Sequence, residues 1–195
     1  MSDDAPVGVA AENRNPDTGQ AFAAWPDELH ALLKSLGVSQ VAMVPDAGHA
    51  RLIRLCEDDN EMTVVRLTTE EEGVSLLTGA WLGGAKGVLL MQSSGVGNCI
   101  NMLSLPAVLR IPVLMLVTMR GEWGEFNPMQ VAMGQATQTV LEAMGVIVRR
   151  ADRAEEVVEA VSGAARIAFN SSAPAAVLIG QQMLGAKDFK ELAKP

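Results

Sequence analysis

Short apolar runs alternate along this chain with longer segments that have the spacing of amphipathic helices. The runs that predict strands are residues 38–44, 62–67, 87–91, 113–118, 146–149 and 174–179. Helical spacing is found over about residues 26–36, 50–56, 69–84, 98–109, 129–144 and 152–169. Continuous apolar strands between helices are typical of a parallel sheet covered on both faces. The pattern therefore predicts an α/β fold, a three-layer, doubly wound, mostly parallel six-stranded sheet with helices on both faces.

The two ends of the chain differ in composition from its middle. Residues 1–24 are rich in Ala, Asp, Asn, Gly and Pro and have no periodicity, which predicts a flexible N-terminal arm. Residues 25–183 carry the alternating pattern and form one predicted domain, and residues 184–195 form a polar C-terminal tail. A chain of 195 residues is long enough for one domain with a substantial core.

Composition and charge narrow the choice of partners. The chain is 49% hydrophobic and only 19% charged, and this surplus of apolar side chains predicts an obligate oligomer with buried subunit interfaces. A net charge of -8 argues against a nucleic-acid partner, since phosphate contacts need clustered Lys and Arg. The longest apolar run, residues 111–119, is about half a membrane span. We therefore expect a cytoplasmic protein that binds neither membrane nor nucleic acid.

Cysteine usage gives no sign of a metal or disulfide framework. Cys56 and Cys99 are the only cysteines and lie far apart in the sequence. We expect both to be buried thiols and expect no metal site on this chain.

Polar side chains are concentrated in the segments that follow the predicted strands. Because the carboxyl ends of parallel strands meet at one edge of a sheet, side chains from these segments should lie together. Loops are polar in any protein, so the concentration alone does not prove a site. In chain order the candidates are Asp46, His49, Glu70, Glu71, Glu72, Gln92, Ser93, Ser94, Asn98, Arg120, Glu122, Trp123, Glu125 and Asn127.

Three acidic residues, Glu70, Glu71 and Glu72, open the third predicted helix. Acids at a helix N-terminus are stabilised by the dipole and by capping, which is sufficient to explain Glu70 and Glu71. Helical spacing puts Glu72 on the face of the small and apolar residues Leu76, Gly79, Ala80 and Gly83. A carboxylate at the head of a packed face needs a partner. We therefore expect Glu72 to be the functional carboxylate.

The polar segment of residues 92–98 is broken by glycine and predicts a loop. It lacks the lysine of a nucleotide-binding phosphate loop, so it is a weak phosphate site when taken alone. A serine hydrolase is not indicated, because the Gly-x-Ser-x-Gly elbow is absent and nothing connects His30 or His49 to Ser93 or Ser94.

These residues carry a family resemblance. Glu72-Gly73, the small-residue helix after it, and the segment from Met91 to Asn98 resemble the pyrimidine-binding domain of thiamine diphosphate enzymes. Within that group the chain is most similar to the alpha subunits of the sulfopyruvate decarboxylase family and to the matching half of phosphonopyruvate decarboxylases. The residues around Asp46 and Arg120 fall where that family has comparable motifs, and the resemblance spans about residues 26–182.

The resemblance implies a role for each candidate. Glu72 is expected to hydrogen-bond N1′ of the cofactor's aminopyrimidine and favour the imino tautomer, whose nitrogen takes the proton from C2 of the thiazolium. The ylide then attacks the ketone of a 2-oxo acid, and the cofactor is the electron sink while carbon dioxide leaves. The further residues expected to bind thiamine diphosphate are Gln92, Ser93, Ser94 and Asn98.

The resemblance is less specific about which residues contact the substrate. We expect Asp46, Arg120 and Glu122 to contact substrate, with the guanidinium on an anionic group. The alternative for Arg120 is a loop salt bridge with Glu122 or Glu125. His49 is a candidate proton donor to the enamine intermediate, although the family pattern does not require a histidine there.

One family motif is absent from the chain. The family holds the diphosphate and Mg²⁺ through a Gly-Asp-Gly motif on a second domain, and this sequence has no Gly-Asp-Gly. The resemblance thus implies a beta-type partner subunit with that domain, a hetero-oligomer of α2β2 or larger, and a small anionic 2-oxo acid such as 3-sulfopyruvate. Two alternatives remain open, a non-catalytic α/β binding or scaffold subunit and an acetolactate-type carboligase subunit.

Overall fold

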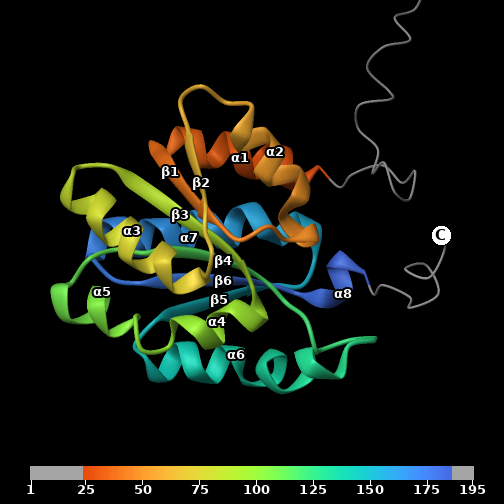
Figure 1. Cartoon of the computed structure of the whole chain (residues 1–195). Helices are drawn as coiled ribbons and strands as arrows, with labels where there is room; N and C mark the ends of the chain where they lie inside the picture. The colour runs from red at the N-terminus through yellow and green to blue at the C-terminus, as the bar shows by residue number, and fades with distance from the viewer. Residues whose placement is uncertain (1–23, 186–195) are drawn as a thin grey trace, which may run out of the picture.

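A six-stranded parallel sheet forms the middle layer of the molecule in the computed structural model, which describes residues 24–185 (Figure 1). The predicted N-terminal arm and C-terminal tail therefore lie almost entirely outside the described residues. The sheet order is β2-β1-β3-β4-β6-β5, and every pairing is parallel. The strands are β1 (Val38–Met43), β2 (Thr63–Arg66), β3 (Lys86–Gln92), β4 (Leu114–Thr118), β5 (Ile147–Ala151) and β6 (Ala175–Ile179). The predicted fold class is confirmed.

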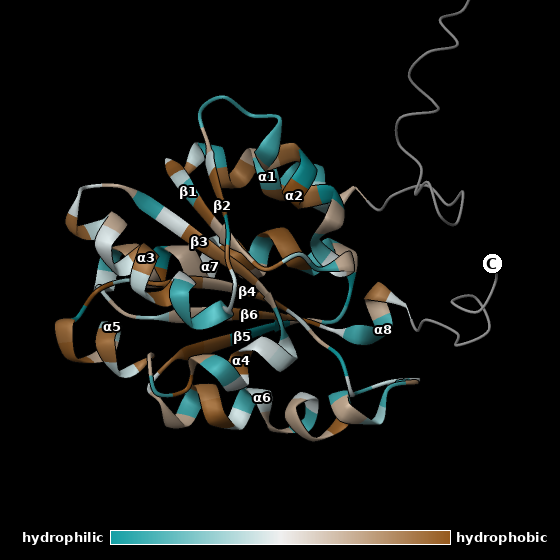
Figure 2. Cartoon of the chain, viewed as in Figure 1, coloured by the Kyte–Doolittle hydropathy of each residue, from teal (hydrophilic) through white to brown (hydrophobic). Residues whose placement is uncertain are grey.

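Helices cover both faces of the sheet. One face carries α1 (Trp25–Ser35), α2 (Ala50–Glu57) and α7 (Ala154–Ser171). The other carries α3 (Glu70–Leu82), α4 (Ser93–Cys99), α5 (Ser104–Leu109) and α6 (Val131–Ala143). Two separate apolar cores result, and the brown central strands in Figure 2 lie between them. No helix of the described residues combines the length and apolarity needed to cross a bilayer.

The strand order creates a switch point at the carboxyl edge of the sheet. From β1 the chain passes through α2 to β2 on one side, and then returns through α3 to β3 on the other side. Ligands of open α/β sheets bind outside the strand ends at such a point. Two short 3₁₀ helices lie near this edge, η1 (Ala47–His49) after β1 and η2 (Pro128–Gln130) before α6, and α8 (Gln181–Leu184) follows β6.

Close packing brings α3 against the middle of the sheet. A Cβ on Gly73 would overlap the side chains of Leu89 and Leu67, and a Cβ on Gly87 would overlap Leu77. Because neither glycine has a side chain, α3 and β3 pack closely, and the first turn of α3 lies next to the segment that follows β3. This approach fixes the position of the acidic residues at the start of α3.

The segment after β3 differs from the prediction. The segment of residues 92–98, expected as a polar loop, lies mostly in α4, and residues 98–109, expected as one helix, are divided between the end of α4, a turn and α5. Pro106 accounts for the division. It has no N–H, so it is accommodated in the first turn of a helix, where no intrahelical acceptor is needed, and α5 begins two residues before it.

Candidate functional site

Glu70 and Glu72 lie on the same helix turn but have opposite environments. Glu70 is the first residue of α3 and is only 9% exposed, and Nδ2 of Asn98 donates to its Oε2 at 2.9 Å. Glu72 is exposed, and its Oε2 accepts the backbone N–H of Thr68 at 2.9 Å. The expectation that Glu72 heads the buried face is therefore wrong, and the withdrawn carboxylate belongs to Glu70.

The side of α3 that faces the sheet explains why Glu70, and not Glu72, is buried. Gly73, Val74 and Leu77 follow Glu70 at spacings of three, four and seven residues, and all three are buried against the sheet. Glu72 instead points back over the N-terminus of α3 and caps it, which is a common role for an acid in this position. The sequence thus contained a second possible buried face for this helix, one that begins at Glu70 and continues through Val74 and Leu77.

Helix α4 crosses directly over the Glu70 carboxylate. A Cβ on Gly95 would overlap the carboxyl carbon and Oε1 of Glu70, so only a glycine allows this approach. Within the described residues no donor forms a hydrogen bond to Oε1. Glu70 therefore has one oxygen held by an amide and one oxygen without a partner, beneath the backbone of Gly95.

Asp46 connects three strand ends rather than facing outward. Its Oδ1 accepts Nε2 of Gln92 at 3.0 Å, its Oδ2 accepts the Thr118 hydroxyl at 2.5 Å, and its side chain is 6% exposed. Burial acts to raise the pKa of Asp46, but the neighbouring His49 ring and the Thr118 hydroxyl outweigh it and hold the pKa well below its usual range. Asp46 was expected to contact substrate, but both of its carboxylate oxygens accept hydrogen bonds from side chains of this chain.

His49 is completely buried beside Asp46. Its Nδ1 lies 3.4 Å from Oδ2 of Asp46, a contact that is electrostatic rather than a directional hydrogen bond. Neither ring nitrogen has a hydrogen-bond partner among the described residues. His49 therefore lies at the expected edge of the sheet, but its ring is buried in the protein interior.

The four residues expected to bind cofactor after β3 separate into two groups. Gln92, Ser94 and Asn98 lie at the edge, and Oε1 of Gln92 accepts the Ser94 hydroxyl at 3.2 Å and Nε2 of Gln130 at 3.0 Å. Ser93 is buried, and its hydroxyl accepts the backbone N–H of Arg120 at 3.0 Å. Ser93 therefore joins the ends of β3 and β4.

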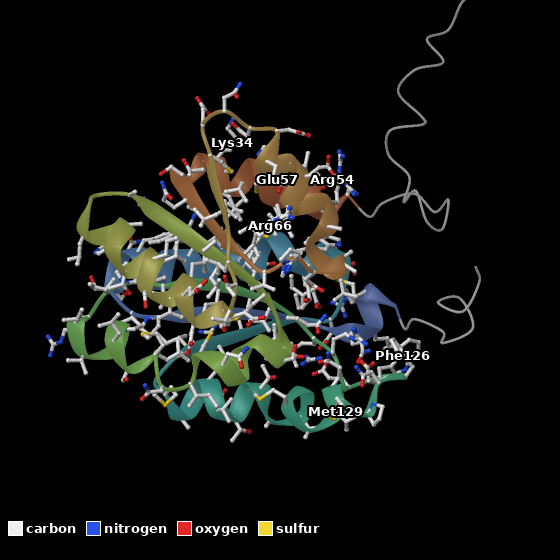
Figure 3. All side chains as sticks on the ribbon, in the orientation of Figure 1. Lys34, Arg54, Glu57, Arg66, Phe126 and Met129 are labelled. Atoms are coloured by element: carbon white, nitrogen blue, oxygen red, sulfur yellow. The ribbon has the colours of Figure 1, made fainter. Side chains whose placement is uncertain are left out.

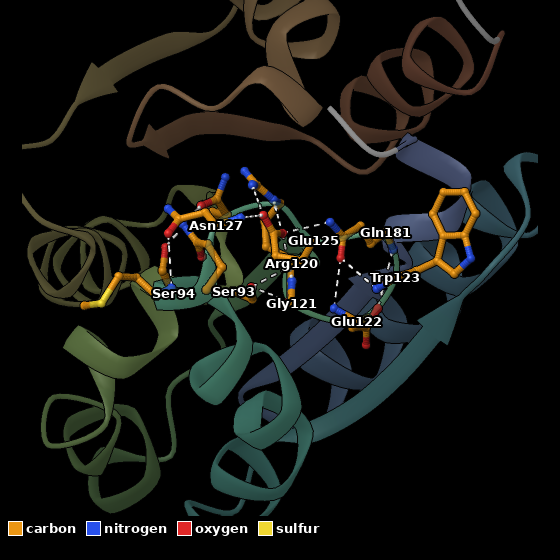
Figure 4. Close-up of polar contacts among 12 residues, drawn as sticks. Ser93, Ser94, Arg120, Gly121, Glu122, Trp123, Glu125, Asn127 and Gln181 are labelled. Carbon is orange, nitrogen blue, oxygen red and sulfur yellow. Dashed lines mark hydrogen bonds and ion pairs between the residues drawn. The ribbon is translucent and has the colours of Figure 1, made fainter. Parts of the chain in front are cut away.

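The segment after β4 is organised around Glu125, as Figure 4 shows. Nε of Arg120 donates to Glu125 Oε2 at 2.7 Å, and a second guanidinium nitrogen donates to Oε1 at 2.5 Å. The backbone N–H groups of Gly121 and Asn127 donate to the same carboxylate, as does Nε2 of Gln181. These bonds, with Arg120 first, lower the pKa of Glu125 to about 2. Of the two interpretations of Arg120, the structure favours the salt bridge, with Glu125 as its partner.

Glu122 pairs with Arg150, near the carboxyl end of β5. Its two oxygens accept from two guanidinium nitrogens of Arg150 at 2.7 and 2.8 Å. The backbone N–H groups of Glu122 and Trp123 both donate to Oε1 of Gln181. Gln181 was missed from the sequence, although it stands directly after the last strand, where the other candidates were found.

Comparison with known proteins shows which family the chain is similar to. The family model described as "Pyruvate flavodoxin/ferredoxin oxidoreductase, thiamine diP-bdg" matches residues 45–189. The chain is also 37% identical over 150 residues to the sulfopyruvate decarboxylase subunit alpha of Methanococcus maripaludis, covering 76% of this chain and 89% of the relative.

The chain belongs to this thiamine diphosphate-binding family.

Two of the similar proteins are much longer than this chain. The phosphonopyruvate decarboxylase of Streptomyces viridochromogenes is 38% identical over 117 residues, which cover 59% of this chain but 30% of that protein. A solved 2-oxoglutarate:ferredoxin oxidoreductase from Magnetococcus marinus superposes with a TM-score of 0.62 at 15% identity, covering 82% of this chain and 29% of that one. This structural likeness shows the fold alone. In these two proteins the region similar to this chain is one part of a larger polypeptide.

Proposed function

We propose that this chain is the alpha-type subunit of a thiamine diphosphate-dependent decarboxylase that acts on a small anionic 2-oxo acid such as 3-sulfopyruvate. One observation carries the proposal: Glu70 presents a buried carboxylate, with one oxygen unpaired, at the carboxyl edge of a parallel sheet. A carboxylate withdrawn from water is suited to share a proton with a ring nitrogen. Family membership supports the same cofactor.

The residues at this edge fit an aminopyrimidine ring. Oε1 of Glu70 has no hydrogen-bond partner among the described residues and can hold a proton against N1′, and the lack of a side chain on Gly95 makes room for the carboxyl group. When bound, thiamine diphosphate supplies the electron sink for the loss of carbon dioxide. Gln92 and Ser94 stand at the same edge to contact the cofactor, and Ser93 holds the two strand ends that carry them. We assign the proton-sharing role to Glu70 and not to Glu72, since Glu72 is exposed and engaged in capping.

One guanidinium nitrogen of Arg120 is available to bind substrate. Its Nε and Nη2 bind Glu125, whereas its Nη1 has no hydrogen-bond partner among the described residues. The guanidinium also lies 5.3 Å from the centroid of the Phe126 ring, which holds it in place. We infer that an anionic group of the substrate would bind through Nη1, with Asp46 and Glu122 shaping the pocket through their partners.

The remaining half of the site is proposed to lie on a beta-type subunit that holds the diphosphate and Mg²⁺. The name of the relative, subunit alpha, supports a partner of this kind. Apolar side chains are exposed around the same edge: Trp123 is 49% exposed, Met129 84% and Val131 41%. Figure 3 shows Phe126 and Met129 at the end of the molecule where α6 begins. Exposed apolar groups beside a polar site are typical of a protein interface.

The partner contact can be tested by substitution. Met129→Glu is expected to weaken co-purification with the beta-type subunit at least about tenfold, because a charge would be buried in the interface. Val108→Glu is the matched control, since Val108 is 79% exposed but is carried by α5, away from this edge. Equal assembly of Met129→Glu and the parent would contradict the proposed interface.

The activity itself is tested on the assembled complex. The chain is co-expressed with a beta-type partner that carries Gly-Asp-Gly, and release of carbon dioxide from 3-sulfopyruvate is measured with thiamine diphosphate and Mg²⁺. The expected products are carbon dioxide and an aldehyde. A complex that leaves the cofactor unbound in calorimetry would support the scaffold alternative, and an acyloin product would support the carboligase alternative. Either result would overturn the proposal.

A further inference from the structure

The only hydrogen bond to the Glu70 carboxylate within the described residues comes from Asn98. The two residues lie 28 positions apart and join the first turn of α3 to α4, and the Nδ2–Oε2 distance is 2.9 Å. Asn98 stands one helical turn after Gly95, whose backbone lies against the carboxyl carbon of the same side chain. The carboxylate is thus contacted at two points by one face of α4.

These two contacts restrict the carboxylate differently. The Gly95 backbone limits where the carboxyl group can move, because the space beyond it is filled. The Asn98 amide selects its rotation, because a donor at Oε2 makes the two oxygens unequal. The oxygen that is left for a ligand is then always Oε1.

The chemistry of the amide matters as much as its position. An amide donates a hydrogen bond without adding charge, whereas a guanidinium would neutralise the carboxylate and hold it ionised. The neighbouring Cys99 thiol adds no charge either, since burial, followed by the charges of Glu70 and Glu71, raises the pKa of Cys99 to about 12. The Asn98 amide therefore orients the Glu70 carboxylate without pairing it with a cation.

We propose that Asn98 is a positioning residue, which orients the Glu70 carboxylate so that Oε1 faces the aminopyrimidine nitrogen. This inference rests on the proposed function of Glu70. It differs from the expectation that Asn98 binds the cofactor directly, because here Asn98 acts through Glu70.

The test uses the assembled complex and two variants. Asn98→Ala removes the donor and leaves the carboxylate free to rotate, so kcat is expected to fall about 10- to 100-fold. Asn98→Asp keeps the size but replaces the donor by a second negative charge, and it is expected to lose more than Asn98→Ala. Asn101→Ala is the matched control, an exposed asparagine in the turn that follows α4, and it is expected to keep kcat within about twofold.

A binding measurement separates positioning from a direct contact. The affinity for thiamine diphosphate, measured by calorimetry with Mg²⁺, is expected to fall about 3- to 10-fold in Asn98→Ala when Glu70 is present, and to be unchanged by Asn98→Ala in a Glu70→Gln background. Equal losses in both backgrounds would overturn the positioning role, as would full activity of Asn98→Asp. Full activity of Glu70→Gln would instead overturn the proposed function, so the two failures are distinguishable.

Discussion

Glu70 and Glu125 are two acidic residues at one edge of the sheet, both withdrawn from solvent, with opposite local chemistry. Glu125 has a side chain that is 3% exposed and receives the guanidinium of Arg120, two backbone N–H groups and the amide of Gln181. Glu70 receives a single neutral amide, and no cation pairs with it in the part of the chain that the structure describes. Both carboxylates are buried, but only one is neutralised.

The two carboxylates differ in their partners rather than in their burial, and this difference separates the structural Glu125 from the carboxylate proposed to exchange a proton. The pKa of Glu125 is lowered to about 2, so this group stays ionised and serves to fold the segment after β4. Glu70 has one oxygen without a hydrogen-bond partner and no pairing cation within residues 24–185, which suits the proton exchange with a ligand that we propose for it. Breaking each arrangement should therefore have a different kind of effect.

Apart from the loss of the Glu70 carboxylate itself, the largest effect is expected from Gly95→Ala. The new Cβ would overlap the end of the Glu70 side chain, which can swing aside, so the fold should survive while the carboxylate loses its place. A displacement of about 1 Å is expected to lower kcat of the complex about 100-fold, with a change in unfolding free energy below about 1 kcal/mol. Steady-state kinetics and chemical denaturation measure the two quantities.

The matched control for Gly95 is Gly97→Ala. A Cβ on Gly97 would meet only the flexible Met133 thioether, at 3.2 Å, so kcat is expected to change less than about threefold. If Gly95→Ala and Gly97→Ala were equally active, the close contact of α4 with Glu70 would have no role in catalysis.

Arg120→Ala tests the opposite side of the comparison. It leaves the buried Glu125 carboxylate without its cation, and the unfolding free energy is expected to fall by about 2–3 kcal/mol. Arg66→Ala is the control, because Arg66 is 66% exposed and lies 3.4 Å from Glu57, and its loss should cost less than about 0.5 kcal/mol. Equal stability of the two variants in urea denaturation would contradict a structural role for the Arg120–Glu125 pair.

A smaller effect is expected from pH. The pKa of Glu125 is about 2 in the folded chain and near 4.5 without its partners, so its stabilisation is present above about pH 4.5 and is lost as the pH falls toward 2. Between about pH 5 and pH 3 the stability advantage of the parent over Glu125→Gln should shrink by about 1–2 kcal/mol, allowing for solvent screening. Denaturation curves at both pH values measure it. A constant difference would show that the pair does not hold Glu125 ionised.

Much of the fold and part of the site could be predicted from the sequence. Continuous apolar strands between amphipathic helices specified a parallel sheet, and the rule that ligands bind at strand ends gathered Asp46, Gln92 and Asn98 at one edge. The helix phase was not determined, because the small residues Gly79 and Ala80 resemble a packed face although Gly79 is exposed in the structure.

The partners of individual side chains were also not predictable from the sequence. Sequence shows that Arg120 and Glu125 are near one another, but only three-dimensional contacts show that Gln181, 56 residues away, completes the set. For the same reason Ser93 could not be separated from Ser94, since one hydroxyl is buried against Arg120 and its neighbour is exposed.

The most direct test of the assigned carboxylate compares Glu70→Gln with Glu72→Gln in the assembled complex. Each change removes one charge and keeps the size of the side chain, so the two variants differ only in which acid is lost. Carbon dioxide release is expected to fall about 1000-fold in Glu70→Gln and to stay within about threefold of the parent in Glu72→Gln. The reverse order, with Glu72→Gln inactive and Glu70→Gln active, would contradict the central claim.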